Sequence, residues 1–149
     1  MLRLSRLTDY AVVVLVRLSR GDAVQTSPGI AASTGIPEPT VAKVLKILAA
    51  GGFVASQRGA HGGYRLLRAL QTVPISDVIE AIDGPIALTA CVDGGSNCDA
   101  HHVCPVRGRW DRVNDAIFQA LSGITLADMG EPPAFRAKAA AFAAPPVAE

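Results

Sequence analysis

Three cysteines lie close together in the second half of the chain and are its most reactive group of side chains. Cys91, Cys98 and Cys104 are separated by six and by five residues, in a stretch rich in Gly, Asn and Asp. Thiolates are soft donors that suit zinc and iron–sulfur clusters. Structural zinc sites usually take two ligands from a knuckle with about two to four residues between its cysteines, so these wider gaps indicate a loop able to surround a larger group.

Two other interpretations of this stretch stay open from the residues alone. His101 or His102 would supply a fourth ligand to a zinc ion, or the three thiols would be unligated, which is awkward in so polar a loop. An odd number of cysteines in a cytoplasmic chain argues against a disulfide framework and favours a metal or redox site. We expect no enzyme, because the sequence contains no nucleophile triad, phosphate-binding glycine loop or paired-carboxylate site.

Length and composition favour an ordinary globular protein of the cytoplasm. Half of the 149 residues are apolar, which is enough to bury a core. No apolar run approaches the roughly 18–20 residues of a membrane span. The first residues lack the apolar stretch of a signal peptide, so we expect cytoplasmic localisation and no membrane partner.

The charge is distributed unevenly along the chain, although the total is only +1. Residues 1–68 carry nine Lys and Arg against three Asp and Glu, a net charge of +6. Residues 69–149 carry five basic and ten acidic groups, a net charge of −5. A basic half joined to an acidic half indicates that the first half meets a polyanion.

Two short helices joined near a glycine predict a helix-turn-helix. The first begins at Ser27, which can cap it, and stops at Gly35. The second carries an apolar stripe at helical spacing, formed by Val41, Val44, Leu45 and Leu48. Thr40 and Lys43 then point outward, as expected for a helix that reads double-stranded DNA. The DNA contacts predicted in this helix pair are Ser27, Thr40 and Lys43.

A β-hairpin with a glycine-rich tip follows the helix pair. Residues 53–57 and 64–67 predict its strands, and the glycines between them permit the positive φ values of a tight tip. An arginine at such a tip can enter a narrow minor groove, and glycine N–H groups can approach phosphates. The DNA contacts predicted in this wing are Arg58, Gly59, His61, Gly63 and Tyr64. Together with the helix pair, the hairpin predicts a winged helix.

Further helices are expected on both sides of the winged helix. Apolar residues at helical spacing predict one near the start of the chain, at Leu7, Ala11, Val14, Leu15 and Leu18. Another is expected to be capped by Ser76 and to stop at Gly84, and a capping motif at 125–128 opens a short last helix. The predicted fold class is therefore mainly α with a small β-hairpin.

A long amphipathic helix is expected to open at Pro105 and to end at Gly123. Its apolar stripe consists of Val106, Trp110, Val113, Ile117 and Leu121. We expect a second copy of the chain to cover this stripe, because helix-turn-helix proteins commonly read palindromic half-sites about 34 Å apart. The predicted organisation is a winged helix-turn-helix over 1–70, the cysteine loop and dimerisation helix over 71–133, and an Ala-rich tail over 134–149.

Together these motifs resemble the bacterial winged-helix regulators that sense iron–sulfur clusters, the IscR, NsrR and RirA type, and most closely the repressor of SUF iron–sulfur assembly operons. The resemblance runs from about residue 1 to residue 129 and leaves out only the Ala-rich tail. The segments that carry it are Leu7–Ala11, Arg58–Tyr64, the three cysteines followed by Pro105, and Ile124–Asp128. Each segment alone is a weak signal, and the combination is specific.

The resemblance implies a homodimer that holds a two-iron or four-iron cluster in each cysteine loop, near the partner's N-terminal helix. The three cysteines would be ligands. In two-iron members a histidine follows the third cysteine by three residues, and here that position is Arg107, which cannot ligate. In some four-iron members an acid near the start of the other subunit completes the site, and Asp9 stands at that position. We favour Asp9 over the local alternatives, His101 and His102.

The function that the resemblance implies is that of a transcriptional repressor which senses iron–sulfur cluster status and controls genes for cluster assembly. Loss of the cluster would free the loop over 91–104 and shift the helices that carry both reading heads. A nitric-oxide or redox sensor of the same build is one alternative. A zinc-stapled DNA-binding protein without a sensing role is another. A rival from a different class is an electron-transfer or redox enzyme that uses the cysteine loop, which would leave the wing unexplained.

Overall fold

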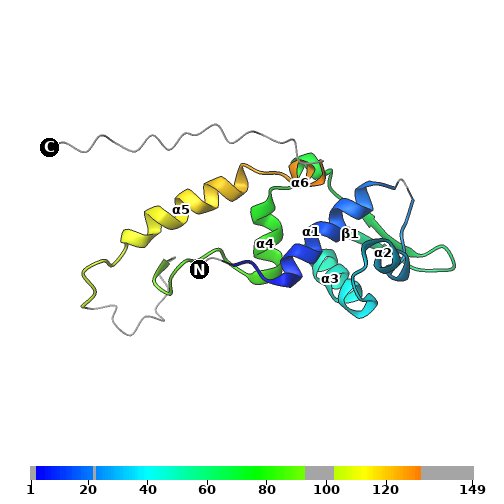
Figure 1. Cartoon of the computed structure of the whole chain (residues 1–149), viewed down its shortest axis with the longest axis horizontal. Coiled ribbons are helices and arrows are strands. Elements are labelled where there is room, and N and C mark those ends of the chain that lie inside the picture. Colours follow the sequence, from blue (N-terminus) through cyan, green and yellow to red (C-terminus); the bar gives the residue numbers. More distant parts are fainter. Residues whose placement is uncertain (1–2, 22, 93–102, 132–149) are drawn as a thin grey trace.

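The computed structural model describes residues 3–21, 23–92 and 103–131, and it confirms a mainly α fold with one small β-hairpin (Figure 1). The elements in chain order are α1 (Arg6–Ser19), α2 (Ser27–Thr34), α3 (Glu38–Ala50), β1 (Val54–Gln57), β2 (Gly63–Leu66), the 3-10 turn η1 (Leu70–Thr72), α4 (Ile75–Asp83), α5 (Arg109–Ser122) and α6 (Leu126–Gly130). Figure 1 shows α5 to one side of α1–α3, with α4 between them. Within the described ranges, no helix is long and apolar enough to cross a membrane.

One hydrophobic core joins the helix-turn-helix to the later helices. The predicted stripes of α1 and α3 lie in this core, where Val14, Val44 and Leu45 are fully buried. Val78 of α4 and Leu126 of α6 enter the same core from the second half of the chain. The core therefore crosses residue 70, and the division of the chain at that point stays a prediction.

The helix α2 is capped by a different residue from the predicted one. Thr26 has an extended backbone, and its Oγ1 accepts a hydrogen bond from the Gly29 N–H at 3.2 Å. Ser27 is already the first helical residue, so the prediction that it caps α2 is wrong by one position. The predicted stop is confirmed, because Gly35 takes the left-handed conformation, with φ 73°.

The predicted cap of α4 is also wrong. The helix begins at Ile75 after Pro74, which places Ser76 inside the first turn. Ser76 is buried, and its hydroxyl accepts a hydrogen bond from the Ser122 hydroxyl of α5, with 3.0 Å between the oxygens. The side chain therefore joins two helices that lie far apart in the sequence, which no local pattern reports.

The helix α5 is shorter than the predicted long helix. It begins at Arg109 and not at Pro105, because Gly108 adopts a left-handed conformation with φ 71° immediately before it. Its 14 residues correspond to a length of about 21 Å. On its apolar stripe, Trp110 and Val113 are 42% and 43% exposed. The predicted long C-terminal helix is therefore not confirmed. The shorter α5 nevertheless has an apolar face that is exposed at Trp110 and Val113.

The hairpin gains a third strand-like partner from the connection between α1 and α2. β1 and β2 pair antiparallel along their four residues. Gln25 and Tyr64 exchange two backbone hydrogen bonds, of 2.9 and 2.8 Å. Gly63 has φ 154°, and a Cβ at this position would lie only 2.5 Å from the carbonyl oxygen of Gln25. The absence of a side chain at Gly63 thus lets the hairpin pack against the start of the helix-turn-helix.

Candidate nucleic-acid interface and metal site

The outward face of α3 carries the polar residues that the sequence places there. Val41, Val44, Leu45 and Leu48 are fully buried on the opposite face. Lys43 and Lys46 are exposed, and Thr40 is partly exposed near the start of the helix. Since the apolar face packs on α1 and α2, α3 presents its basic face to solvent. This orientation is the one that a DNA-reading helix requires.

The wing residues fall into two groups. Arg58, Gly59 and His61 are exposed at the tip, which a hydrogen bond from the Gly62 N–H to the Gly59 carbonyl closes at 2.9 Å. Tyr64 is partly buried against the hydrophobic core, and its backbone pairs with Gln25. The tip residues can therefore reach a groove, whereas Gly63 and Tyr64 hold the hairpin in place.

The basic surface, which we define as Lys43, Lys46, Arg58 and Arg65, is not neutralised by nearby acids. Within the described ranges, Arg68 and Asp77 form the one ion pair, with 3.3 Å between nitrogen and oxygen. Arg68 also lies over the ring of Phe53, 5.7 Å from its centre, so this arginine joins the base of the wing to α4. The basic surface keeps its positive charge free for a polyanion.

Ser27, a predicted DNA contact, has an unusual environment at the start of α2. Its Oγ is buried and has no hydrogen-bond partner among the residues that the structure describes. An unsatisfied buried hydroxyl costs about 1–3 kcal/mol, so any external acceptor that reached it would be favoured. In addition, the first N–H groups of a helix have no partner within the helix, so together with the helix dipole they attract anions.

The two described cysteines are free thiols at either end of the segment that the structure leaves undescribed. Cys91 and Cys104 are both partly exposed, and Cys91 Sγ lies 3.2 Å from the Thr89 hydroxyl. Cys98, and with it His101 and His102, lies outside the described residues. Two accessible thiols with a third between them in sequence suit a soft metal or a cluster, so the donor set fits the group that the sequence predicts.

Asp9 belongs to no metal site that the described residues of one chain form. It is exposed in the first turn of α1, where the helix dipole favours an acid. Among the described residues, no three His, Cys, Asp or Glu side chains gather closely enough to hold a metal ion. Asp9, Cys91 and Cys104 therefore do not meet in a single subunit. A pocket of about 350 Å³ borders Asp9, with Leu4 and Met129 among its lining residues.

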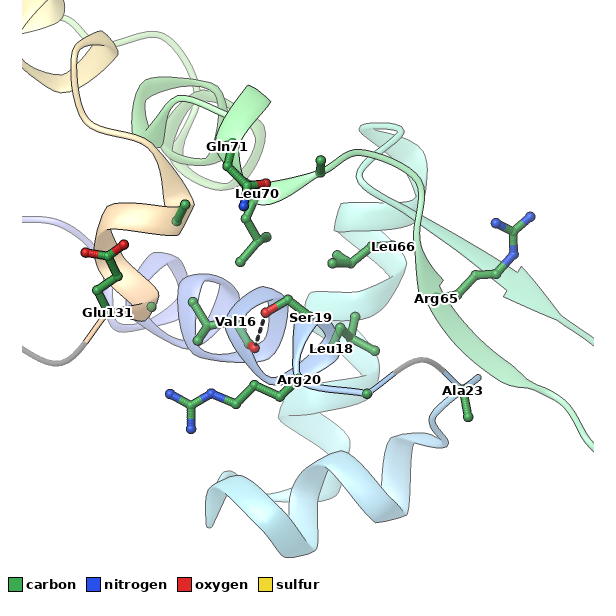
Figure 2. A pocket seen from close by; sticks show the side chains of 14 residues that line it. Val16, Leu18, Ser19, Arg20, Ala23, Arg65, Leu66, Leu70, Gln71 and Glu131 are labelled. Carbon is green, nitrogen blue, oxygen red and sulfur yellow. Dashed lines mark hydrogen bonds between the residues drawn. The ribbon is translucent and has the colours of Figure 1, made fainter.

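A larger pocket has neither of the described cysteines in its lining. Its volume is about 650 Å³, and it is bounded by the end of α1, by β2, by η1 and by α6. Figure 2 shows that its two arginines, Arg20 and Arg65, point away from one another. The Ser19 hydroxyl donates to the Val16 carbonyl at 2.7 Å and has no histidine or cysteine beside it in this lining. The pocket has no nucleophile–base pair.

Asp83, at the end of α4, contacts the start of α1 and was not singled out by the sequence. Its Oδ2 accepts hydrogen bonds from the Thr8 hydroxyl at 2.7 Å and from the Ser5 N–H at 3.2 Å. Burial acts to raise the pKa of Asp83, but the hydrogen bonds from Ser5 and Thr8 outweigh it, and the pKa is lowered. The carboxylate thus ties two helices while it stays ionised.

Asn114 is the second polar residue that sequence reasoning missed. It is the one buried side chain of α5, and it is only 5% exposed. Its Nδ2 donates to the Ile86 carbonyl at 2.9 Å, and its Oδ1 accepts from the Leu88 N–H at 3.0 Å. The only sequence signal was an asparagine between apolar positions of an amphipathic helix.

Residues 4–132 match the Rrf2 family, which is described as iron-dependent transcriptional regulators. An rrf2-like HTH-type transcriptional regulator of Rhodobacter capsulatus is 36% identical over 130 residues, which cover 80% of this chain and 87% of that protein.

Two solved structures extend the comparison to the fold. The global cysteine regulator CymR of B. subtilis has a TM-score of 0.68 at 26% identity, and the alignment covers 87% of this chain and 97% of that one. IscR of T. potens has a TM-score of 0.64 at 28% identity, with 86% and 85% covered. The likeness spans nearly all of both proteins, so it includes the winged helix and the helices that follow it.

Proposed function

The chain belongs to the Rrf2 family of iron-dependent transcriptional regulators, and we propose that it is a repressor which senses iron–sulfur cluster status and controls genes for cluster assembly. Relatives such as the R. capsulatus protein are named as transcriptional regulators, which supports a role in binding DNA and not in catalysis. The observation that carries the sensing role is the pair of free, partly exposed thiols, Cys91 and Cys104.

In this proposal the helix-turn-helix reads double-stranded DNA. Thr40 and Lys43 of α3 face the major groove, and the wing tip places Arg58 and His61 at the adjacent minor groove. The remaining proposed contacts are the Ser27 hydroxyl, the backbone of Gly59 and Gly63, and Tyr64. The exposed and unpaired state of Lys43 and Arg58 supports the assignment, because phosphate contacts need charge that no protein acid neutralises.

Cys91, Cys98 and Cys104 would hold an iron–sulfur cluster, with the partner subunit's Asp9 as the fourth ligand. When bound, such a cluster supplies a redox-sensitive and oxygen-labile group whose presence reports iron and sulfur status. Asp9, Cys91 and Cys104 form no common group of metal ligands among the described residues of one chain, which supports a ligand from the partner. A histidine of the loop, His101 or His102, is the competing fourth ligand.

We propose that the chain forms a dimer through the uncovered face of α5. Trp110 and Val113 are more than two-fifths exposed, although both are large apolar side chains. A second copy packed on this face removes their surface from water and relates the two winged helices by a two-fold axis. The pocket beside Asp9 then offers a place for the partner's cysteine loop, because exposed Leu4 and Met129 give it an apolar rim.

Anaerobic purification followed by an absorption spectrum and by iron and sulfide assays tests the sensing role. We expect visible thiolate-to-iron bands and acid-labile sulfide, and we expect both to decline in air. The iron count per chain separates a two-iron from a four-iron cluster. Binding to promoter DNA is then compared between the loaded and the stripped protein, and an equal affinity in the two states would contradict the proposal.

Two alternatives give different results in the same experiment. A colourless protein that carries zinc and resists reconstitution would indicate a zinc-stapled DNA-binding protein without a sensing role. A cluster that survives air and is destroyed by nitric oxide would indicate a nitric-oxide sensor of the same build. Both alternatives keep the DNA-binding surface and change only the chemistry of the cysteine loop.

A further inference from the structure

The segment that leads from α4 to Cys91 is held by side chains from two other helices. Asn114 of α5 makes one hydrogen bond to the backbone at Ile86 and another to the backbone at Leu88, both of 3.0 Å or less. A side-chain amide that both donates to and accepts from one segment fixes its position and its direction. Burial of Asn114 keeps water from competing for these two bonds.

The other end of the same segment is held on α1. Asp83 accepts from the Thr8 hydroxyl, and Thr8 is 1% exposed in the core of the winged helix. Asp83 and Ile86 are three residues apart, so one short stretch of backbone is tied to α1 at one end and to α5 at the other. Thr8 is also the neighbour of Asp9, the proposed ligand to the partner's cluster.

The held segment continues directly into the first cysteine. Val92 donates a backbone hydrogen bond to the Thr89 carbonyl at 3.2 Å, and its side chain is 5% exposed. This turn contains Cys91, whose Sγ lies against the Thr89 hydroxyl. Cys91 is only three residues beyond Leu88. Because the Leu88 backbone is hydrogen-bonded to Asn114 of α5, its position restricts where the Cys91 thiol can lie.

We propose that Asn114 is a positioning residue which holds the backbone of Ile86 and Leu88 on α5 and thereby restricts the position of Cys91, three residues further along the chain. This contact links the start of the cysteine loop to the helix that carries the proposed dimer face. The inference depends on the proposed function only in taking Cys91 as a ligand. In the wild type, Asn114 keeps the first thiol in place before any metal arrives. Without it, Cys91 moves with a free segment, and a bound cluster loses one preorganised ligand.

Hydrogen exchange of the metal-free full-length protein tests the positioning role. Asn114→Leu removes both hydrogen bonds, and Gln119→Leu makes the matched change at an exposed position of the same helix. We expect the Leu88 amide to exchange at least about tenfold faster in Asn114→Leu and to be unchanged in Gln119→Leu. Alkylation of Cys91, mapped by mass spectrometry, should accelerate relative to that of Cys104. Unchanged Leu88 exchange overturns the inference.

A second variant keeps the test valid if Asn114→Leu fails to fold. Asn114→Gln keeps the amide, with both its donor and its acceptor, on a side chain that is one methylene longer and therefore misaligns the two hydrogen bonds. We expect it to keep the helical circular dichroism of the wild type and to show a smaller increase in exchange over 84–92. Exchange that rises equally throughout the chain would mean general destabilisation and would also overturn the inference.

Cluster lifetime separates this inference from the proposed function. The bleaching rate of the visible bands in the presence of a chelator is compared between wild type and Asn114→Leu, and we expect about a threefold or greater increase. A wild-type protein without a cluster refutes the proposed function, while the exchange result still decides the role of Asn114. A loaded wild type with the same bleaching rate as the variant refutes the inference alone.

Discussion

Replacement of Gly63 by alanine distinguishes a packing role of this wing glycine from a DNA-contact role. The Cβ of the variant would lie 2.5 Å from the Gln25 carbonyl oxygen and 2.8 Å from Val24 Cγ1. The Gln25 carbonyl cannot simply move aside, because it accepts the Tyr64 N–H at 2.8 Å. Gly63 also has φ 154°, a backbone conformation that alanine rarely adopts.

The cost follows from two separate terms. A side chain held at a disfavoured positive φ costs about 1–3 kcal/mol, and overpacking against a backbone atom adds about 1–3 kcal/mol. The two terms sum to about 2–6 kcal/mol, and we therefore expect Gly63→Ala to lower the free energy of unfolding by about 4 kcal/mol, the middle of this range. For a protein of this size that corresponds to a fall of roughly 10 °C in Tm.

Gly59 provides the matched control within the same wing. Its φ is 113°, and a Cβ there would meet nothing within 4 Å. Gly59→Ala therefore retains the backbone term and lacks the packing term, so we expect it to cost about 1–3 kcal/mol. The difference between the two variants isolates the contact between Gly63 and Gln25.

Urea unfolding followed by far-ultraviolet circular dichroism measures both variants at one fixed protein concentration, because a dimer gains stability with concentration. Gly63→Ala should lose at least about 1 kcal/mol more than Gly59→Ala. Equal losses would refute the packing argument and would leave DNA contact as the reason for glycine at this position.

Three further predictions concern the interface, the pH dependence and the dimer. Lys43→Ala should reduce the slope of log affinity against log salt on a labelled duplex by about one, with Arg112→Ala of α5 as an unaffected control, and an unchanged slope would remove Lys43 from the interface. Asp83→Asn should destabilise the protein at pH 7. The difference in unfolding free energy between wild type and variant should shrink as the pH falls below 3.8, the ordinary pKa of an aspartate. Burial acts to raise the pKa of Asp83, but the hydrogen bonds from Ser5 and Thr8 outweigh it, so the folded pKa lies below the ordinary value of 3.8. The stabilisation from Asp83 is therefore present above pH 3.8 and is lost as the pH falls through the folded pKa. Val113→Asp should dissociate the dimer in sedimentation, and a wild type that already sediments as a monomer would contradict the proposed role of α5.

The sequence determined the elements whose signals are local. The stripe Val41, Val44, Leu45 and Leu48 is fully buried as predicted, because helical periodicity depends only on residues three and four apart. Gly35 ends α2 in the left-handed conformation, and Thr125 forms the predicted capping box with Asp128. The uneven charge, the wing glycines and the cysteine spacing were also visible without a fold.

Boundaries were predicted less well, because they depend on single backbone conformations. Thr26 and Ser27 are both competent caps, and only the extended backbone of Thr26 decides between them. Pro105 is a good start for a helix, but the left-handed Gly108 delays α5 by four residues. Ser76 is a good cap by type, yet its hydroxyl is used by Ser122 from another helix.

Only the tertiary structure decided which polar residues hold the chain together near the cysteines. Asp83 meets Thr8 across 75 positions of sequence, and Asn114 meets Ile86 across 28. Such pairs leave no periodic pattern, since each depends on how two separately folded elements pack. The sequence thus determined the winged helix and the spacing of the cysteines that follow it. Packing decided where the backbone before Cys91 lies, and it decided that Asp9, Cys91 and Cys104 form no common site within one chain.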